Sequence, residues 1–471
     1  MDRLRGFFHP RGIAVFGSMT EGWFFGGAVV IKELQALGYE GAICPIHPTA
    51  RTVYGLQVYP DISQVGAEVD LAVIATSCRA VPGILRACGE KGVKAAVVIA
   101  DNFAEAGPEG EARQEELVAI AREYGIGVIG PNTLGIYKPH SALSTIPYEK
   151  GYHLPAARGG LSVITQTGMY GPQATPLNEY RFGVNCIIDL GNMCDIDEVD
   201  CLEHLENDPE TTVIGIYMEH TRRPRAFLET ARRVSAEKPV LCLKGGRSAA
   251  AARAMASHTG SIAGSDGLYD ALFRQAGIVR VNDYEDLLGV AKAFLAQPLP
   301  RGNRLGIVSL TGAIGIQCID IASQCGLVPG EIGASSRQEL LELSPTLTGH
   351  PIDLGPASAV SGGDLFGYYE RCFDILMADD GIDCIYLNTY ISSYISTEVY
   401  GPVFEHMGQN LRKPVTMWAY GPSSEAVARL GDLAERHGIP FYPTTRRAVF
   451  ALGYLAGYAR WRDRVLTGSP C

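Results

Sequence analysis

The sequence predicts an α/β protein of several domains, each built on a parallel sheet. Short β-branched runs alternate with amphipathic or Ala/Glu-rich stretches from one end of the chain to the other. Strands that alternate with helices of this length are typical of βαβ units, in which a crossover helix joins two parallel strands. The chain has 471 residues, which is too many for a single hydrophobic core.

The first domain is expected over residues 1–130. Its candidate strands are the runs G-I-A-V-F-G, G-A-I-C-P-I, D-L-A-V-I-A, A-A-V-V-I-A and G-V-I-G-P-N, with helical patterns between them. Residues 131–158 lack hydrophobic periodicity, and we expect them to form a connection. Two further α/β domains are expected over residues 159–297 and 302–465, with the linker-like stretch P-L-P-R-G-N-R between them.

The last two domains show signs of an internal repeat. The run L-S-V-I-T-Q-T-G-M-Y-G at 161–171 resembles L-G-I-V-S-L-T-G-A-I-G at 305–315 in its apolar positions and in its Leu, Thr and Gly residues. Further along, I-G-I-Y-M-E at 214–219 resembles I-D-C-I-Y-L-N at 382–388. The order of these matches predicts two related domains in tandem.

Composition excludes several classes of protein. Forty basic and 51 acidic side chains give a net charge of −11, which disfavours general binding to nucleic acid or to anionic membranes. No apolar stretch is long enough to span a bilayer, and the N-terminus lacks the apolar region of a secretory signal. The twelve cysteines form no C-x-x-C pair, so neither a zinc site nor a disulfide framework is predicted. We expect a reduced, cytoplasmic protein without a metal site.

Two strand-to-helix turns are candidate anion sites. The first turn contains Gly17 and Ser18 but does not fit G-x-G-x-x-G, and no acid for a ribose follows at the usual distance, so an ordinary NAD site is not predicted. Its helix N-terminus can hold a phosphate, although a plain structural turn explains the stretch equally well. The second turn is T-Q-T-G-M at 165–169, whose hydroxyls and glycine suit an anion, while Thr165 could equally be an N-cap.

His258 stands in the stretch S-H-T-G-S-I-A-G-S-D, where nearly all its neighbours are small. Small neighbours leave room for a ligand to approach the imidazole. The absence of nearby His or Cys residues argues against zinc, which leaves a nucleophile and a helix-capping residue as the alternatives. A nucleophilic imidazole needs an acceptor, usually a carboxylate, for its second nitrogen. Glu219 is the candidate, because it ends the strand-like run I-Y-M-E.

The segment S-H-T-G-S-I-A-G-S-D-G-L-Y-D-A-L-F-R-Q-A-G-I-V-R-V closely resembles the phosphohistidine segment of NDP-forming acyl-CoA synthetases, the superfamily of succinyl-CoA synthetase. Further matching stretches are G-P-N-T-L-G, T-Q-T-G, G-N-M-C-D-I-D-E-V-D, D-P-E-T-T-V-I-G-I-Y-M-E and K-P-V-L-C-L-K-G-G-R, so the resemblance covers essentially the whole chain. It implies the order of an α subunit, in which a Rossmann-like CoA-binding domain precedes two flavodoxin-like ligase domains.

The resemblance also implies roles for individual residues. His258 would be the phosphorylated nucleophile, and Glu219 would hold the far nitrogen of its ring. The backbone of Thr167, Gly168 and Met169 would bind phosphate. The residues that would contact CoA are Gly17, Ser18, Pro45, Pro48 and Asn132.

The implied activity is that of the α-type subunit of an acid–CoA ligase. A small carboxylic acid, CoA and ATP would give acyl-CoA, ADP and phosphate through an acyl phosphate and phospho-His258. None of the expected domains resembles an ATP-grasp module, so Mg-ATP or ADP is expected on a β-type ATP-grasp partner in a hetero-oligomer. The alternatives are a CoA- or acyl-CoA-binding regulatory protein without turnover and a phosphate-independent acyl-CoA transferase.

Three positions depart from the pattern of the family. His220 follows Glu219 where the family usually has glycine, and Met19 stands in G-S-M where the family has G-A-S. The aromatic run W-F-F comes shortly after Met19. His350 opens H-P-I-D where family members commonly have N-P-V-D.

Overall fold

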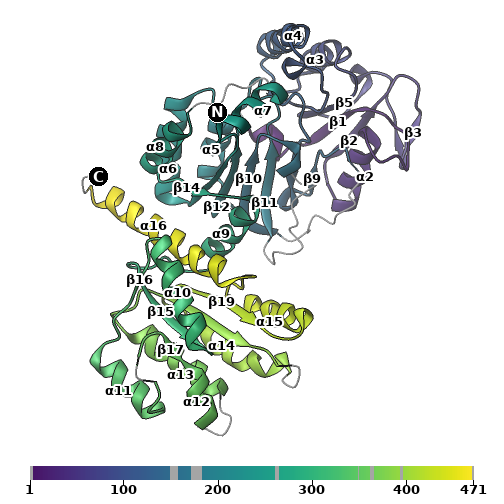
Figure 1. The fold of residues 1–471 in the computed structure, drawn as a ribbon. Helices are drawn as coiled ribbons and strands as arrows, with labels where there is room; N and C mark the ends of the chain where they lie inside the picture. The colour runs from purple at the N-terminus through teal and green to yellow at the C-terminus, as the bar shows by residue number, and fades with distance from the viewer. Residues whose placement is uncertain are drawn as a thin grey trace. The chain divides into compact units, whose positions relative to one another are not determined.

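The computed structural model describes residues 4–148, 158–170, 183–259, 265–347, 349–360, 365–392 and 396–468, without the side chains of residues 158, 255–259 and 358–360. The chain divides into two compact units, Met1–Tyr284 and Glu285–Cys471. In Figure 1 the first unit runs from purple to teal and the second from green to yellow. None of the described helices has the length and apolar content needed to cross a membrane.

A five-stranded parallel sheet in the order β2-β1-β5-β6-β7 forms the first part of the first unit, which confirms the α/β fold with a parallel sheet that the sequence predicts. Its strands are β1 (Gly12–Gly17), β2 (Ala42–Ile46), β5 (Leu71–Ala75), β6 (Ala95–Val98) and β7 (Gly127–Ile129). A short hairpin of β3 (Thr52–Val53) and β4 (Leu56–Gln57) follows β2.

Different helices cover the two faces of this sheet. Ile13 of β1 packs in a core with α2 (Gly27–Leu37), whereas its neighbour Ala14 packs with α3 (Val81–Lys91) and α4 (Pro108–Tyr124). Successive side chains of a strand point to opposite faces, so both faces are buried. The carboxyl ends of the strands are therefore the edge at which a ligand can approach.

The second sheet of the first unit has the order β14-β13-β12-β10-β11-β8-β9. Its parallel strands are β10 (Arg158–Thr165), β11 (Val184–Asp189), β12 (Val213–Met218), β13 (Val240–Lys244) and β14 (Val279–Val281). The described helices of this part are α5 (Glu198–Asn207), α6 (Pro224–Glu237), α7 (Ala249–Thr259) and α8 (Asp266–Ala276).

The connection expected over residues 131–158 contributes two strands to this sheet. β8 (Ile136–Lys138) pairs antiparallel with β11, and β9 (Leu143–Ser144) pairs antiparallel with β8. Strands this short show no hydrophobic period in a sequence. Their pairing with β11 attaches this segment to the second sheet.

The second unit is built on a third sheet, in which β16-β15-β18-β19 are neighbours and β17 also pairs with β15. These strands are β15 (Arg304–Ser309), β16 (Val328–Pro329), β17 (Ile352–Asp353), β18 (Cys384–Tyr390) and β19 (Val415–Tyr420). The described helices are α9 (Tyr284–Ala296), α10 (Gly312–Gln324), α11 (Ala334–Leu343), α12 (Leu354–Val360), α13 (Leu365–Ala378), α14 (Gly401–Gln409), α15 (Ser424–Arg436) and α16 (Thr445–Thr467).

Helix α9 groups with the second unit, whereas the sequence analysis places its residues in the middle domain. Lys292 of α9 forms an ion pair with Glu435, and the hydroxyl of Tyr442 donates to the carbonyl of Gly289 at 2.8 Å. The predicted boundary followed the Pro- and Gly-rich stretch after residue 297. These side-chain contacts, which composition does not reveal, attach the helix to the last sheet.

The predicted repeat is visible in both sheets, because β10-β12-β13 and β15-β18-β19 have the same order and direction. The strand registers give the equivalences. Leu161 pairs with Val213, and Leu305 pairs with Cys384, so Glu219 corresponds to Tyr390. The sequence match of I-Y-M-E with I-Y-L-N would instead make Glu219 equivalent to Asn388, which is wrong by two residues. Apolar residues along a strand do not reveal such a shift.

His350 has a structural role in the second unit. Its Nε2 accepts the N–H of Ile307 at 2.9 Å, between the parts of β15 that pair with β16 and with β17. Burial lowers the pKa of His350 to about 4. The ring is therefore neutral near pH 7, with its proton on Nδ1, and completes the hydrogen bonding of a central strand.

The folded second unit should lose stability in acid because of His350. The unfolded chain binds a proton at this residue below about pH 6.5, whereas the folded chain does so only near pH 4, so the free energy of unfolding falls as pH drops through this window. His350→Asn offers an acceptor that does not titrate. Denaturant unfolding at pH 7, 6 and 5 should show the wild type losing stability relative to this variant by about 1 kcal/mol per pH unit. A constant difference between the two proteins would contradict the role of His350.

Candidate active site

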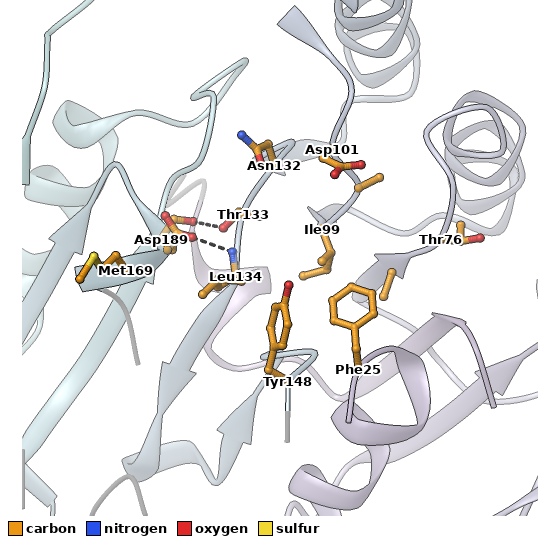
Figure 2. A pocket seen from close by; sticks show the side chains of 13 residues that line it. Phe25, Thr76, Ile99, Asp101, Asn132, Thr133, Leu134, Tyr148, Met169 and Asp189 are labelled. Carbon is orange, nitrogen blue, oxygen red and sulfur yellow. Dashed lines mark hydrogen bonds between the residues drawn. The ribbon is translucent and has the colours of Figure 1, made fainter. Parts of the chain in front are cut away.

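A cleft of about 540 Å³ lies in the first unit, at the carboxyl ends of strands from both of its sheets (Figure 2). Thr76, Asp101 and Asn132 follow β5, β6 and β7 and line it from the first sheet. Gly168 and Asp189, which follow or end β10 and β11, line it from the second. Open α/β sheets bind ligands at this edge, and the volume is that of a small-molecule site.

In the turn after β10, two backbone N–H groups donate to hydroxyls of the turn itself, that of Thr167 to Thr165 at 3.2 Å and that of Met169 to Thr167 at 3.5 Å. The hydroxyl of Thr165 donates to the carbonyl of Thr167 at 2.8 Å and fixes the turn. Gly168 and Met169 line the cleft, as Figure 2 shows for Met169 at its edge. A Cβ atom at position 168 would lie 2.7 Å from the side chain of Leu134, so any other residue here would have to displace that side chain. Such a turn can bind an oxyanion through its backbone.

Glu219 is held next to this turn by Gln166. The Oε1 atom of Gln166 accepts the N–H groups of Glu219 at 2.8 Å and of His220 at 3.1 Å. Its Nε2 atom donates to the carbonyl of His220 at 2.8 Å. One buried amide thus joins the turn to the end of β12 through three hydrogen bonds. The motif T-Q-T-G predicts the turn but no role for Gln166. The indication of that role in the sequence is an amide among small residues at the end of an apolar strand.

The second copy of the repeat shows which of these features the fold itself requires. Ser309 donates to the carbonyl of Thr311 at 2.9 Å, as Thr165 does to Thr167, so the turn is the same. Leu310 stands in place of Gln166, and Tyr390 in place of Glu219. The architecture therefore forms without the amide and the carboxylate, and their presence in the first copy calls for a chemical reason.

The surroundings of Glu219 include a hydroxyl and a buried cation. Tyr217 donates its hydroxyl to Oε1 of Glu219 at 3.4 Å, and burial raises the pKa of that hydroxyl, so it stays protonated. Lys244 ends the neighbouring strand β13, with its Nζ 4.5 Å from the ring of Tyr269. Burial lowers the pKa of Lys244, while nearby carboxylates, Glu219 among them, favour its charged form.

His220, the residue after Glu219, adds no positive charge to these surroundings. Burial lowers the pKa of His220, so its ring is neutral at neutral pH. Within the described part of the chain its Nδ1 atom has no hydrogen-bond partner. The departure from glycine at this position therefore adds an uncharged, half-buried ring after Glu219.

His258 lies near the end of helix α7, and its side chain is outside the described residues, as are residues 260–264. One ion pair links the residues on either side of the segment that carries it. Asp266, the first residue of α8, lies 3.8 Å from Arg247, which comes just before α7. Asp266 also pairs with Arg280 of β14, which fixes the start of α8 against the sheet.

The predicted CoA residues lie along the edge of the first sheet. Gly17 ends β1 and pairs with Ala75, which lines the cleft. Pro45 is buried in β2, and Pro48 is exposed in the loop that follows. Of these predicted residues only Asn132 lines the cleft, where its side chain donates to Asn192 at 3.3 Å.

The first turn differs from the family pattern in ways that the structure explains. Met19 is buried in the core beside Gly27, so it fills space below the turn. Trp23 and Phe24 are each 53% exposed, and Phe25 lines the cleft.

Asp189 is a further residue that the sequence analysis missed. Its carboxylate is fully buried and accepts the N–H of Leu134 at 2.6 Å, as Figure 2 shows. It also accepts the N–H of Gly191 at 3.3 Å. Burial raises the pKa of Asp189 to about 6. It fixes the backbone of the segment after β7 against β11. In the sequence, the indication of this role is a charged residue at the end of the apolar run N-C-I-I-D.

In the described residues no group of acidic, His and Cys side chains is arranged to hold a metal ion.

Comparison with protein families and solved structures agrees with this architecture. Residues 11–139 match the CoA binding domain, and residues 158–294 match the succinyl-CoA ligase like flavodoxin domain. The solved structure of a dinucleotide forming acetyl-coenzyme A synthetase 1 from Ca. Korarchaeum cryptofilum, in complex with phosphate and ADP, superposes with a TM-score of 0.88. The two are 31% identical, and the match covers 100% of both chains.

Curated relatives extend the match to the full length of the chain. The α subunit of the ADP-forming acetate–CoA ligase II of Pyrococcus furiosus is 34% identical over 93% of each chain. The α subunit of enzyme I of the same organism is 32% identical over 98% of this chain and 99% of its own length. The ADP-forming acetate–CoA ligase II of Archaeoglobus fulgidus is 33% identical over 98% of this chain and 67% of its own length. The chain is therefore a member of the ADP-forming acid–CoA ligases, the acid–thiol ligases that share the domains of succinyl-CoA ligase.

Proposed function

We propose that the chain is the α-type subunit of an ADP-forming acid–CoA ligase, which converts a carboxylic acid, CoA and ATP to acyl-CoA, ADP and phosphate. The observation that carries this proposal is the set of three hydrogen bonds made by Gln166. They hold Glu219 and the turn at 165–169, which we call the anion turn, in one rigid site. The α subunits of the Pyrococcus furiosus enzymes support it, since they match this chain over 93% and 99% of their length.

In this proposal the chain's own residues divide the work of phosphoryl transfer. His258 carries the phosphoryl group on one ring nitrogen, and Glu219 accepts the N–H of the other and balances the charge of the phosphorylated ring. The carboxylate of the acid attacks phosphorus, the N–P bond breaks, and an acyl phosphate forms. The N–H groups of the turn at Thr167, Gly168 and Met169 hold the phosphate oxygens during this step.

Thioester formation then takes place in the cleft. Gly17, Ser18, Pro45 and Pro48 hold CoA along the edge of the first sheet, and Asn132 contacts it where it enters the cleft. The thiol gives up its proton, sulfur bonds to the acyl carbon, and the bond from that carbon to the phosphate oxygen breaks. Phosphate then leaves the turn or, in the reverse direction, bonds through one oxygen to the acyl carbon of the thioester, and the bond from that carbon to sulfur breaks.

The two alternative functions do not account for the site. A CoA-binding regulatory protein or a phosphate-independent transferase needs the fold and a CoA site, but no carboxylate oriented for a phosphorylated histidine. The second copy of the repeat, with Leu310 and Tyr390, shows that folding does not require this arrangement.

We place the Mg-ATP or ADP site on an ATP-grasp β-type partner. The Pyrococcus furiosus relatives that this chain matches over nearly their full length are named as α subunits. The Archaeoglobus fulgidus relatives are longer, and this chain covers 67% and 64% of them. A phosphoryl group must then cross from the partner to His258, which puts the segment 248–265 at the contact between the two proteins.

The first test of this proposal is the phosphoenzyme. With ATP labelled in its γ-phosphate and the ATP-grasp subunit, the chain should acquire label that is labile in acid and stable in alkali. The label should disappear in His258→Ala and fall by about 10- to 100-fold in Glu219→Gln, which keeps an acceptor but removes the charge. His406→Ala removes a histidine of the second unit that bonds Asp374, and it serves as the control. Label that persists in His258→Ala would assign the nucleophile to another residue.

Gln166→Leu provides a sharper test of the rigid site. It installs the residue that the second copy has at this position, so the fold should form, while Glu219 loses its backbone anchor. We expect normal CoA binding by calorimetry and a phosphoenzyme yield reduced at least about tenfold. Gln166→Glu keeps the acceptor oxygen and should recover part of the yield. Leu310→Gln is the matched control in the second unit and should leave the yield unchanged. An equal loss in both Gln166→Leu and Leu310→Gln would mean that the effect is structural.

The need for a second protein in the ligase reaction can be measured directly. The 471-residue chain alone should form no thioester from acid, CoA and ATP, and addition of the ATP-grasp subunit should start the reaction. Size-exclusion chromatography should show a complex of the two. Ligase activity from the chain alone would place the nucleotide site within it and remove the need for the partner.

A further inference from the structure

The cleft has an apolar side that the chemistry of phosphate and CoA does not require. Phe25 and Tyr148 lie together there, with ring centroids 4.7 Å apart and planes tilted by 57°. Figure 2 shows the two rings below Ile99, with Leu134 beside Tyr148. These four side chains form what we call the apolar wall.

The apolar wall is held in place by hydrogen bonds of the backbone around it. Phe25 and Tyr148 form an antiparallel bridge, and the next residue, Gly26, donates its N–H to the carbonyl of Pro147 at 2.8 Å. Asp189 accepts the N–H of Leu134 at 2.6 Å. The surface is therefore formed before a ligand arrives, and binding to it costs little reorganisation.

The apolar wall begins at the phosphate-binding turn. Leu134 is the side chain that a Cβ atom at Gly168 would meet at 2.7 Å. In the proposed reaction a single oxygen joins phosphorus to the acyl carbon. With the phosphate on the turn, the acyl group must lie within a few ångströms of Leu134 and extend along the wall.

Two polar residues of the cleft, Asp101 and Asn132, lie away from the apolar wall, whereas the carboxylate of Asp189 beside Leu134 is engaged by backbone N–H groups. Figure 2 shows Asp101 and Asn132 above Ile99 and the two rings below it. Amide and carboxylate groups suit the polar pantetheine arm of CoA, which has amide groups to bond. This division leaves the apolar wall for the acyl group.

We propose that the acid substrate of this chain carries an aryl group, as phenylacetate does, and that this ring packs against Phe25 and Tyr148. The proposal rests on the function proposed above and adds the class of acid. Acetate would leave the wall in contact with water, whereas a ring removes apolar surface from water and meets two aromatic side chains. The volume of about 540 Å³ accommodates a ring together with the end of the pantetheine arm.

Binding to the chain alone gives the first test. Calorimetry should show phenylacetyl-CoA binding at least about tenfold tighter than acetyl-CoA. Phe25→Ala and Tyr148→Leu should each reduce that ratio to less than about threefold, through the loss of ring contact. Phe24→Ala makes the same change one residue earlier, at a side chain that is 53% exposed and does not line the cleft, and should leave the ratio unchanged.

The second test is turnover of the acid by the complex with the ATP-grasp subunit. The value of kcat/KM for phenylacetate should exceed that for acetate at least about tenfold. Leu134→Phe narrows the cleft and should lower the value for phenylacetate while sparing that for acetate. The aryl-acid proposal would be overturned if the ligase preferred acetate and if Phe25→Ala and Leu134→Phe left that preference unchanged. The proposed function would still stand in that case. Absence of both CoA binding and phosphoenzyme would overturn the two proposals together.

Discussion

The three hydrogen bonds of Gln166 are the constraint on which the rest of the site depends. They join the end of β10 to the end of β12, two neighbouring strands whose carboxyl ends carry the anion turn and Glu219. Backbone hydrogen bonds within a sheet fix strands but leave the segments beyond them free to diverge. A buried amide that satisfies two donors and one acceptor removes that freedom. The distance between the turn and the carboxylate of Glu219 is then set by these hydrogen bonds rather than by loop conformation.

The tandem repeat separates what the fold needs from what the chemistry needs. Both copies keep the hydroxyl that closes the turn, at Thr165 and at Ser309, because the turn must redirect the chain after a buried strand. Only the first copy adds Gln166 and Glu219. Glu219 is buried and Lys244 ends the neighbouring strand, also buried; burial opposes the charge of each group, so their presence costs free energy that the fold does not require. The second copy has lost or never acquired this arrangement, while His350 in the same unit completes the hydrogen bonding of β15.

Much of this architecture follows from the sequence, because hydrophobic runs of five or six residues mark buried parallel strands. The five strands of the first sheet and the matching order in the two later sheets were predicted in this way. β8 and β9 were not, since strands of three and two residues carry no period. The attachment of α9 to the second unit depends on Lys292 and Glu435, which are far apart in sequence.

For the site, motifs predicted roles for the turn at Thr167–Met169, for Glu219 and for Asn132. In the structure Gly168, Met169 and Asn132 line one cleft, and Gln166 joins Glu219 to the same turn. The motifs did not identify Gln166 or Asp189, because the importance of both lies in backbone groups that they reach across the fold.

The ion pairs at the base of residues 248–265 have a consequence for how a partner protein would meet this segment. Asp266 pairs with Arg280 and lies 3.8 Å from Arg247, so the residues on either side of the segment are tied to each other before any partner arrives. The entropy of bringing these two ends together is therefore lost during folding and not on binding. In the proposed reaction His258 then belongs to the same molecule as the carboxylate that it needs, and its supply to Glu219 does not depend on how much protein is present.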